Sequence, residues 1–517
     1  MKSFGLITGF VAAWVVVAAT AADTVQVGTP PAGAPQAGSA PQTPGGGGRG
    51  PSAGSLLWND KCAGCHAAGG RAPNLLDEAW LSRTDDTRMM AAIRTGVPGT
   101  EMAAFGVALT DLQTFQLVAH IRTATATARP APAFVATPDG TVVRSAKQPF
   151  RIELVADGLI TPWALAFLPD GRLLVTERDG RLRILDKGKL SEPVSGLPKT
   201  HVQQDGGLMD IKAHPDYARN RWIYLAYAED KPGTTAPPET PPTQVPSMTV
   251  IVRGHINDRN EWTDQQLIYR APAELYTTNG AHYGCKMIFD RQNHLFFSLG
   301  ERGNQPNSQN LKTPLGKIHR VNDDGSLPPD NPFVNSPEAV PTIWSYGHRN
   351  PEGFAWDPII GILWSSEHGP NSADEINIIE KGHNYGWAVA AKSAQPGLEM
   401  SIAGMDDPIV YFTPTFAPAG IAFYTGSRYP AWKNTSLFVT GLRGQALRRL
   451  EVKGRTVVSQ EVLFNQLGRV RDIVQSPDGY FYLALQDPTG VPNPAGGGNI
   501  PLSASTPGRI VRLMPVP

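Results

Sequence analysis

A turn followed by an apolar strand recurs six times in this sequence, and that recurrence restricts the fold more than any other feature. Each unit has an Asp or Asn in a turn and then a run of branched or aromatic residues. The units read LPDGRLLV, HPDYARNRWIYLAYA, DRQNHLFFSL, DPIIGILWSS, WKNTSLFVTG and SPDGYFYLAL. Their spacing of roughly 45 to 75 residues leaves room for four strands in each unit. This predicts an all-β, six-bladed β-propeller over residues 150–517, with a pair of β-sandwiches as the alternative.

The two ends of this region carry matching strand patterns. FRIELVADGL opens the region and GRIVRLMPV closes it. Pairing between them would complete the ring of blades and leave no exposed sheet edge. We therefore expect the last strand of the chain to lie beside the first strand of the propeller.

The first 22 residues have the pattern of an export signal. A lysine is followed by an apolar run and by small residues that end near Ala21 or Ala22. The apolar run approaches the length of a short membrane-spanning helix, so an uncleaved anchor is the alternative. Cleavage predicts a periplasmic or secreted protein whose mature chain has no membrane span.

Two tracts rich in proline and small residues, 23–55 and 124–149, are predicted linkers. They account for part of the chain's 53 glycines and 47 prolines, and turns account for the rest. The formal net charge is zero and Lys/Arg runs are absent from the sequence, which argues against a nucleic-acid partner. A small neutral substrate fits this charge balance better.

Between the linkers, residues 56–123 show helical spacing of apolar residues and contain the motif CAGCH. In a C-x-x-C-H motif the two thiols attach a haem and the next histidine ligates its iron. Cys62, Cys65 and His66 are therefore the predicted haem c attachment residues. The region is expected to be a small all-α domain.

A haem of this kind takes a second axial ligand, and a thioether raises its potential. Met102 lies in the loop GVPGTEMAAFG before the last predicted helix and is the favoured ligand to the haem iron, opposite His66. Met89 and Met90 are the alternatives, but their helical spacing with Ile93 predicts core positions. Residues 56–123 resemble a class I cytochrome c, which implies electron transfer rather than chemistry on a substrate.

The propeller region carries polar motifs between its strand patterns. They are GLMDIKAHPDY, NGAHYG, LGKIHRVNDDGSLPPDNPF, SYGHRNPEGFAWDP, EHGPNSADEIN, KGHNYGW and GRVRDIVQSPDG. Through these motifs and their order, the region resembles the soluble quinoprotein glucose and aldose sugar dehydrogenases. These are six-bladed propellers that bind pyrroloquinoline quinone (PQQ) and calcium. The resemblance implies oxidation of an aldose C1 hydroxyl to a lactone. Electrons would pass to the haem and then to an external acceptor, a cytochrome or another respiratory-chain component.

The resemblance also implies roles for single residues. His282, in NGAHYG, would be the catalytic base, and Arg349 would stabilise charge on the quinone as hydride arrives. The implied PQQ contacts are Arg349, Asn350, Thr415, Arg443, Arg469 and Arg471. The implied calcium ligands are the backbone carbonyls of Gly369 and Pro370 for a catalytic ion, with Glu375 and Tyr385 for a second, structural ion.

Five positions depart from the family's pattern. Asp205 stands where the family has Gln, Ala281 where it has Asp or Asn, and Arg443 where it has Lys. Cys285 and Lys286 replace a small residue and an arginine. These changes bear on substrate identity and on PQQ affinity. They leave two other hypotheses open: the same machinery acting on a non-sugar alcohol or aldehyde such as sorbosone, and a PQQ-less propeller that works as a binding module fused to an electron-carrier cytochrome.

Overall fold

The computed structural model describes residues 53–81, 83–84, 86–128, 133–237, 239–370, 373–389, 401–413, 415–491, 493 and 498–516. The predicted signal and residues 23–52 of the first predicted linker lie outside the described residues. No described helix is long and apolar enough to cross a membrane.

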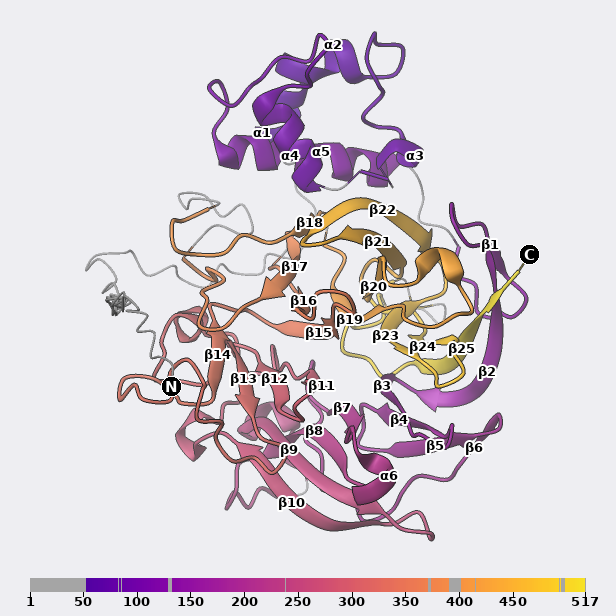
Figure 1. Ribbon diagram of the computed structural model, residues 1–517, viewed down its shortest axis with the longest axis vertical. Helices are drawn as coiled ribbons and strands as arrows, with labels where there is room; N and C mark the ends of the chain where they lie inside the picture. Colours follow the sequence, from indigo (N-terminus) through magenta and orange to yellow (C-terminus); the bar gives the residue numbers. More distant parts are fainter. Residues whose placement is uncertain are drawn as a thin grey trace, which may run out of the picture. The chain divides into compact units, whose positions relative to one another are not determined.

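Six antiparallel sheets follow one another along residues 142–515, and Figure 1 shows them as blades around a common centre. The first blade contains β3 (Pro162–Phe167), β4 (Leu173–Glu177), β5 (Leu182–Asp186) and β6 (Lys189–Leu190). The second contains β7 (Leu208–Ala213), β8 (Ile223–Asp230), β9 (Ser247–Ile256) and β10 (Trp262–Arg270), with the short helix α6 (Tyr217–Asn220). The third contains β11 (Met287–Phe289), β12 (Leu295–Leu299), β13 (Lys317–Val321) and β14 (Ile343–Tyr346).

The remaining three blades complete the ring. The fourth contains β15 (Pro351–Trp356), β16 (Leu363–Glu367), β17 (Asp374–Ile379) and β18 (Val410–Phe412). The fifth contains β19 (Pro418–Phe423), β20 (Ser436–Gly441), β21 (Leu447–Lys453) and β22 (Thr456–Phe464). The sixth contains β23 (Arg469–Gln475), β24 (Phe481–Gln486), β25 (Pro507–Pro515), β2 (Phe150–Ile160) and β1 (Val142–Val143). The propeller prediction is confirmed, and each of the six turn-and-strand units consists of the turn after the first strand of a blade and most or all of the second strand.

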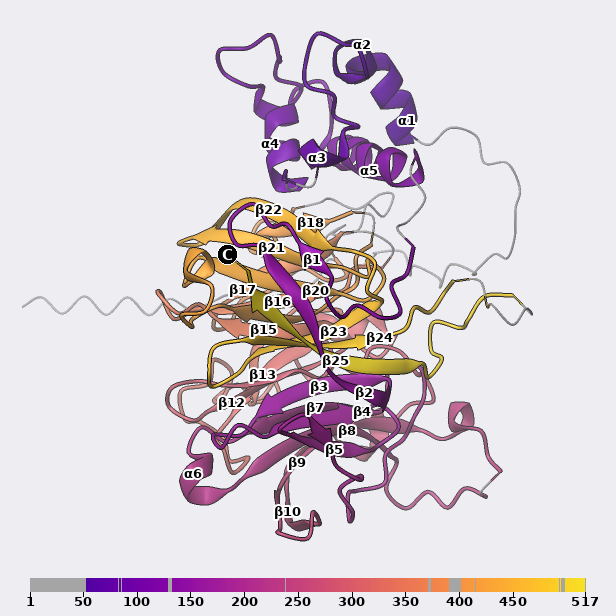
Figure 2. The ribbon, with the colours of Figure 1, turned by 90° about the vertical axis from the view of Figure 1, so that its right-hand side faces the viewer.

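The ring is closed by the two ends of the propeller region, as expected. Strand β2 pairs with β25 in antiparallel fashion, from Phe150 opposite Pro515 to Ile160 opposite Pro507. Figures 1 and 2 both show the purple β2 beside the yellow β25. The last blade is thus built from both ends of the region, which removes a free sheet edge.

Apolar cores lie between neighbouring blades because most strands are buried on both faces. Between the fifth and sixth blades, for example, Tyr429 stacks on Trp432 with ring centroids 4.8 Å apart. Phe438 packs against Phe481 at 4.8 Å in the same cluster. These large rings fill the wedge between two twisted sheets.

Lys286 ties the centre of the ring together with ion pairs. Its Nζ lies 3.2 Å from Asp210 and 3.0 Å from Asp472, which stand on the innermost strands of the second and sixth blades. Burial acts to lower the pKa of Lys286, but the two carboxylates outweigh it and raise that pKa. The departure from the family at this position therefore leaves a fully paired lysine that joins three blades.

The helical region contains α1 (Ala53–Leu57), a π-helical turn (Trp58–Cys62), α2 (Ala63–His66), α3 (Glu78–Leu81), α4 (Asp86–Thr95) and α5 (Asp111–Ala128). Helix α5 begins with a reciprocal cap: Gln113 donates its backbone N–H to Thr110 Oγ1, and Thr110 donates its N–H to Gln113 Oε1. Met89, Met90 and Phe115 are buried in the core of this region.

Two elements lie inside the stretch predicted as the second linker, 124–149. Helix α5 continues to Ala128, because the alanines of this stretch are strong helix formers. Strand β1 pairs with β2, with Val142 opposite Arg151. The linker is therefore shorter than the sequence suggested.

Candidate active site

The predicted site residues gather at one end of the blades because of strand order. In each antiparallel hairpin, the residues before the first strand and after the second strand lie at the same end. His282 precedes β11 and Glu301 follows β12, while Asn350 precedes β15 and Gly369 follows β16. The loops at this end carry the polar residues, as is usual when a rigid scaffold positions a site.

His282 forms a pair with a buried carboxylate that the sequence did not single out. Its Nδ1 lies 2.8 Å from Oε1 of Glu301, which is 1% exposed. The other oxygen of Glu301 accepts the backbone N–H of Gly303, and Asp205 accepts the backbone N–H of His282 at 3.0 Å. A Cβ at Gly300 would lie 2.1 Å from the carbonyl oxygen of His282, so only glycine lets the two loops approach.

This pairing sets the tautomer of the histidine. A carboxylate can only accept a hydrogen bond, so Nδ1 of His282 carries the proton. Nε2 is then the basic nitrogen, free to take a proton from a ligand. His282 thus has the arrangement of a general base whose ring is oriented by the carboxylate of Glu301.

Arg349 stands beside this pair. Its Nη1 donates to the carbonyl of His368 at 3.3 Å, and its Cζ lies 5.5 Å from the ring centroid of Trp387. Its own carbonyl accepts the N–H of Glu301 at 3.0 Å, so the two residues share one backbone contact. Burial lowers the pKa of Arg349.

Asn350 is fully buried and its amide is already engaged on both sides. Oδ1 accepts the N–H of Gly284 at 3.0 Å, and Nδ2 donates to Glu352 at 2.9 Å. Glu352 in turn pairs with Arg471 at 2.7 Å. Asn350 therefore braces the loops around the site, with one amide hydrogen left for a ligand.

Near the same residues lies a group of arginines whose hydrogen-bonding capacity is only partly used. Arg471 lies with its Cζ 3.6 Å from the ring centroid of Trp163, and burial together with the charge of Arg471 lowers the pKa of Arg469 to about 9. Burial, and then Arg471, also lowers the pKa of Arg178, which the sequence did not single out. The buried Nε atoms of all three arginines have no hydrogen-bond partner in the described part of the chain. Such a group fits an anion that carries several carboxylates.

The loop of Gly369 and Pro370 is fixed by Asp374. One oxygen of Asp374 accepts the N–H of Gly369 at 2.8 Å, and the other accepts the hydroxyl of Thr415 at 3.0 Å. The carbonyls of Gly369 and Pro370 are thus presented from a braced turn, and carbonyl oxygens suit calcium. Because Asp374 orients this turn and Thr415 together, the two predicted contacts belong to one local structure.

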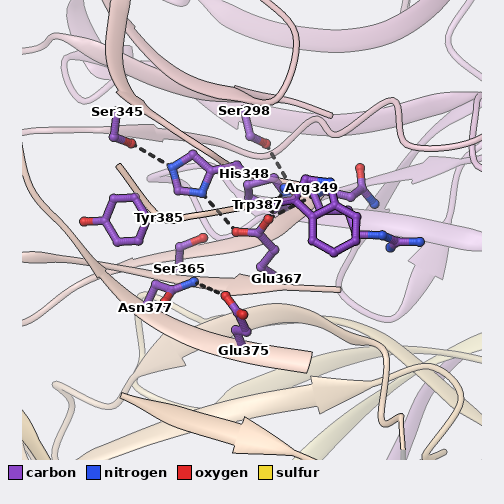
Figure 3. A network of polar contacts seen from close by, with 12 residues as sticks. Ser298, Ser345, His348, Arg349, Ser365, Glu367, Glu375, Asn377, Tyr385 and Trp387 are labelled. Atoms are coloured by element: carbon purple, nitrogen blue, oxygen red, sulfur yellow. Dashed lines mark hydrogen bonds and ion pairs between the residues drawn. The ribbon is translucent and has the colours of Figure 1, made fainter. Parts of the chain in front are cut away.

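Glu375 and Tyr385, the predicted ligands of a second calcium, lie in the same blade (Figure 3). Asp374 and Glu375 are 0% and 7% exposed, so they are not a solvated acidic pair. Glu375 accepts a hydrogen bond from Asn377 at 3.0 Å, and the Tyr385 hydroxyl donates to the carbonyl of Ile378 at 2.6 Å. Over the described ranges, no group of three or more His, Cys, Asp or Glu residues is placed to hold a metal, and the predicted ligands are mostly carbonyls.

Arg443, another predicted cofactor contact, lies at the surface of the propeller. It is exposed and lines a surface hollow with Gln445, Thr489 and Leu502.

The haem-attachment motif lies on the π-helical turn and α2. Cys62 and Cys65 are not joined in a disulfide, so both sulfurs are available for attachment of a haem. Nδ1 of His66 lies 2.9 Å from the carbonyl of Pro73, which fixes the ring and leaves Nε2 for a metal. Met102 is half-buried in its loop. These residues fit a covalently attached haem.

Fold and site together define a six-bladed propeller with a histidine–carboxylate pair at one end, joined to a helical region of cytochrome c type. The chain belongs to the glucose/sorbosone dehydrogenase family, whose model matches residues 159–491. Residues 50–121 match a second family model, the cbb3-type cytochrome c oxidase subunit III.

Similar proteins agree with this assignment. The aldose sugar dehydrogenase YliI of Escherichia coli K12 is 36% identical over 351 residues, 66% of this chain and 91% of that protein. Quinoprotein glucose dehydrogenase B of Acinetobacter calcoaceticus is 29% identical over 427 residues, 66% of this chain and 86% of that protein. The PQQ-bound aldose sugar dehydrogenase structure from Streptomyces coelicolor has a TM-score of 0.54 at 27% identity and covers 70% of this chain and 98% of that one.

Proposed function

We propose that this protein is a quinohaemoprotein dehydrogenase that oxidises the C1 hydroxyl of an aldose to a lactone and passes the electrons to its own haem c. The His282–Glu301 pair beside arginines whose Nε atoms have no partner among the described residues carries the proposal, because it combines a base with an anion site. The names of the relatives, an aldose sugar dehydrogenase and a quinoprotein glucose dehydrogenase, support it.

The arginine group supports PQQ as the cofactor. Arg469 and Arg471 would bind its carboxylates, with Arg178 close by, while Arg349, Asn350 and Thr415 would contact its quinone region. Arg443 is exposed, so we assign it no more than a contact at the rim of the site. When bound, PQQ supplies a two-electron acceptor for the sugar.

The calcium proposal rests on the braced turn described above. Gly369 and Pro370 would hold a catalytic ion through their carbonyls, and Glu375 and Tyr385 would hold a structural one. Calcium, when bound, supplies positive charge that polarises a neighbouring oxygen.

His282 performs the proton chemistry. Its Nε2 would take the proton of the C1 hydroxyl while the hydrogen on the same carbon leaves as hydride, with bound PQQ as the two-electron acceptor, and the C1–O bond becomes the carbonyl of the lactone. The imidazole becomes an imidazolium, and Glu301, 2.8 Å from Nδ1, stabilises the new charge. The guanidinium of Arg349 offers donors for negative charge that develops opposite the sugar.

The helical region is the proposed electron acceptor. Cys62 and Cys65 would attach the haem, with His66 and Met102 as axial ligands. When bound, the haem takes electrons one at a time. Its attachment to the same chain raises its effective concentration near the propeller. The predicted export signal supports a location in the periplasm or outside the cell, where an external cytochrome or respiratory-chain component would take the electrons.

A substrate panel tests the proposal. Protein supplied with PQQ and calcium should reduce a redox dye with aldoses, and His282→Ala should abolish this activity while PQQ still binds. Activity confined to sorbosone or other non-sugars would move the substrate assignment to those compounds. No activity on any of them, with PQQ bound or unbound, would favour a binding module and refute the enzyme.

A further inference from the structure

Glu367 is a buried carboxylate that the proposed chemistry leaves without a role. It ends strand β16, opposite Pro351 on β15, and is 4% exposed. This register places it beneath the loop that carries Arg349 and Asn350 (Figure 3). We propose that Glu367 is a positioning residue for the cofactor site, acting with His348. The proposal rests on the function proposed above.

Both oxygens of Glu367 are bound by three consecutive residues. Oε1 accepts the backbone N–H of Arg349 and, at 3.3 Å, that of Asn350. Oε2 lies 3.0 Å from Nδ1 of His348. One carboxylate thus holds the imidazole of His348 and the backbone N–H groups of Arg349 and Asn350.

His348 is itself held from two further directions. Its Nε2 lies 2.9 Å from the hydroxyl of Ser345, and its ring stacks on Tyr385 with centroids 4.7 Å apart and planes at 22°. His348 is 0% exposed, so water does not compete for these bonds. Hydrogen bonds in such a dry network are stronger than those at the surface.

Arg349 depends on this support because its own side chain is weakly held. Among the described residues, its guanidinium has one direct hydrogen bond, at 3.3 Å to His368, and a distant ring contact with Trp387. Because so few contacts hold this long side chain, its direction depends mainly on the position of the Arg349 backbone. The carbonyl of Arg349 also accepts the N–H of Glu301, the partner of His282. A shift of this segment would therefore move both the arginine and the base pair.

The chain offers a matched control at the other end of a neighbouring blade. In the turn between β11 and β12, Asp290 accepts the backbone N–H groups of Gln292 and His294 with one oxygen. Its other oxygen lies 2.8 Å from Nδ1 of His294. The substitution Asp290→Asn replaces a carboxylate that binds two backbone N–H groups and a histidine ring, as E367Q does, but at a place away from the site.

The test compares E367Q with D290N in the full-length protein. Glutamine keeps the shape of Glu367 but offers a neutral oxygen, and hydrogen bonds to charged groups are the stronger ones. Hydrogen exchange of the PQQ-free protein should show faster exchange at Arg349 and Asn350 in E367Q, and only around His294 in D290N. Tryptophan fluorescence titration should show PQQ binding about tenfold weaker in E367Q and unchanged in D290N. The kcat of E367Q should fall while the KM for sugar stays constant.

Ser345→Ala gives a milder perturbation should E367Q fail to fold. It removes only the hydroxyl on His348 and should shift exchange and PQQ affinity in the same direction by a smaller factor. If the wild-type protein binds PQQ, and E367Q shows the same hydrogen exchange and the same PQQ affinity as wild type, the role of Glu367 is refuted and the proposed function is not. A wild-type protein that does not bind PQQ refutes the proposed function, and this role with it.

Discussion

Replacing Glu301 by glutamine is the most informative single change in the site. The two side chains have the same shape, but the amide can accept with only one end. The N–H of Gly303 already donates to one oxygen of Glu301, so the glutamine must turn its carbonyl to Gly303 and its NH₂ group to His282. Nδ1 of His282 then has to accept, and its proton moves to Nε2, the atom that should take the proton of the sugar.

The expected loss follows from that tautomer change. Without a basic Nε2, and without a carboxylate 2.8 Å from the imidazolium, the proton-transfer step loses both its base and its charge stabilisation. We expect kcat to fall about 10²- to 10⁴-fold, equivalent to about 3 to 5 kcal/mol at 1.36 kcal/mol per tenfold. The KM for sugar should change by less than about threefold, because the ground-state contacts remain.

The assay is steady-state dye reduction by protein loaded with PQQ and calcium, at saturating sugar. PQQ affinity is measured separately by fluorescence titration, so that a loss of cofactor is not counted as a loss of catalysis. Asp290→Asn, which alters an equivalent carboxylate–histidine contact far along the same hairpin, should retain wild-type kcat. An E301Q protein that binds PQQ and keeps kcat within about threefold of wild type would refute the role given to this pair.

Three further changes have defined outcomes. Arg469→Gln should weaken PQQ binding about 10- to 100-fold in a fluorescence titration, because a charge-assisted bond is lost. Without PQQ, the Arg469→Gln variant should be at least as stable in urea as the wild-type protein. Burial and Arg471 disfavour the positive charge of Arg469 in the folded protein and lower its pKa to about 9. Burial lowers the pKa of His319 to about 3, so the unfolded chain gains a proton that the folded protein does not. From pH 8 to pH 5.5 the free energy of unfolding, measured in urea, should therefore fall by about 1.4 kcal/mol through this residue, and the His319→Gln variant should lack this part of the decrease. Removal of calcium with a chelator should abolish dye reduction, and added calcium should restore it if the carbonyls of Gly369 and Pro370 hold the ion.

The propeller could be predicted because its signal is repeated. Six turn-and-strand units reinforce one another, and the strand ending at Pro515 has the same pattern as the strand beginning at Phe150. The haem motif could also be predicted, because Cys62, Cys65 and His66 are adjacent in sequence as well as in space. Residues that are neighbours in the sequence stay neighbours in the fold, so a motif of this kind can be recognised without the structure.

The supporting carboxylates could not be predicted in the same way. Glu301 is 19 residues from His282, and Glu367 is 19 residues from His348, so each pair forms only once a hairpin is in register. A signal was present in both cases: each carboxylate lies at or just after the second strand, and each histidine just before the first. Pairing the two ends of each hairpin would have found both. The arginine group was harder, since Arg178 comes from the first blade and Arg471 from the sixth.

The central claim is that sugar oxidation in the propeller delivers electrons to the haem of the same chain. Stopped-flow absorption of the haem tests it directly, with PQQ and calcium bound and with no dye or external acceptor present. The account predicts that an aldose reduces the haem at a rate independent of protein concentration, as expected for transfer within one molecule. A haem that stays oxidised, in protein that still reduces a dye with the same sugar, would contradict it.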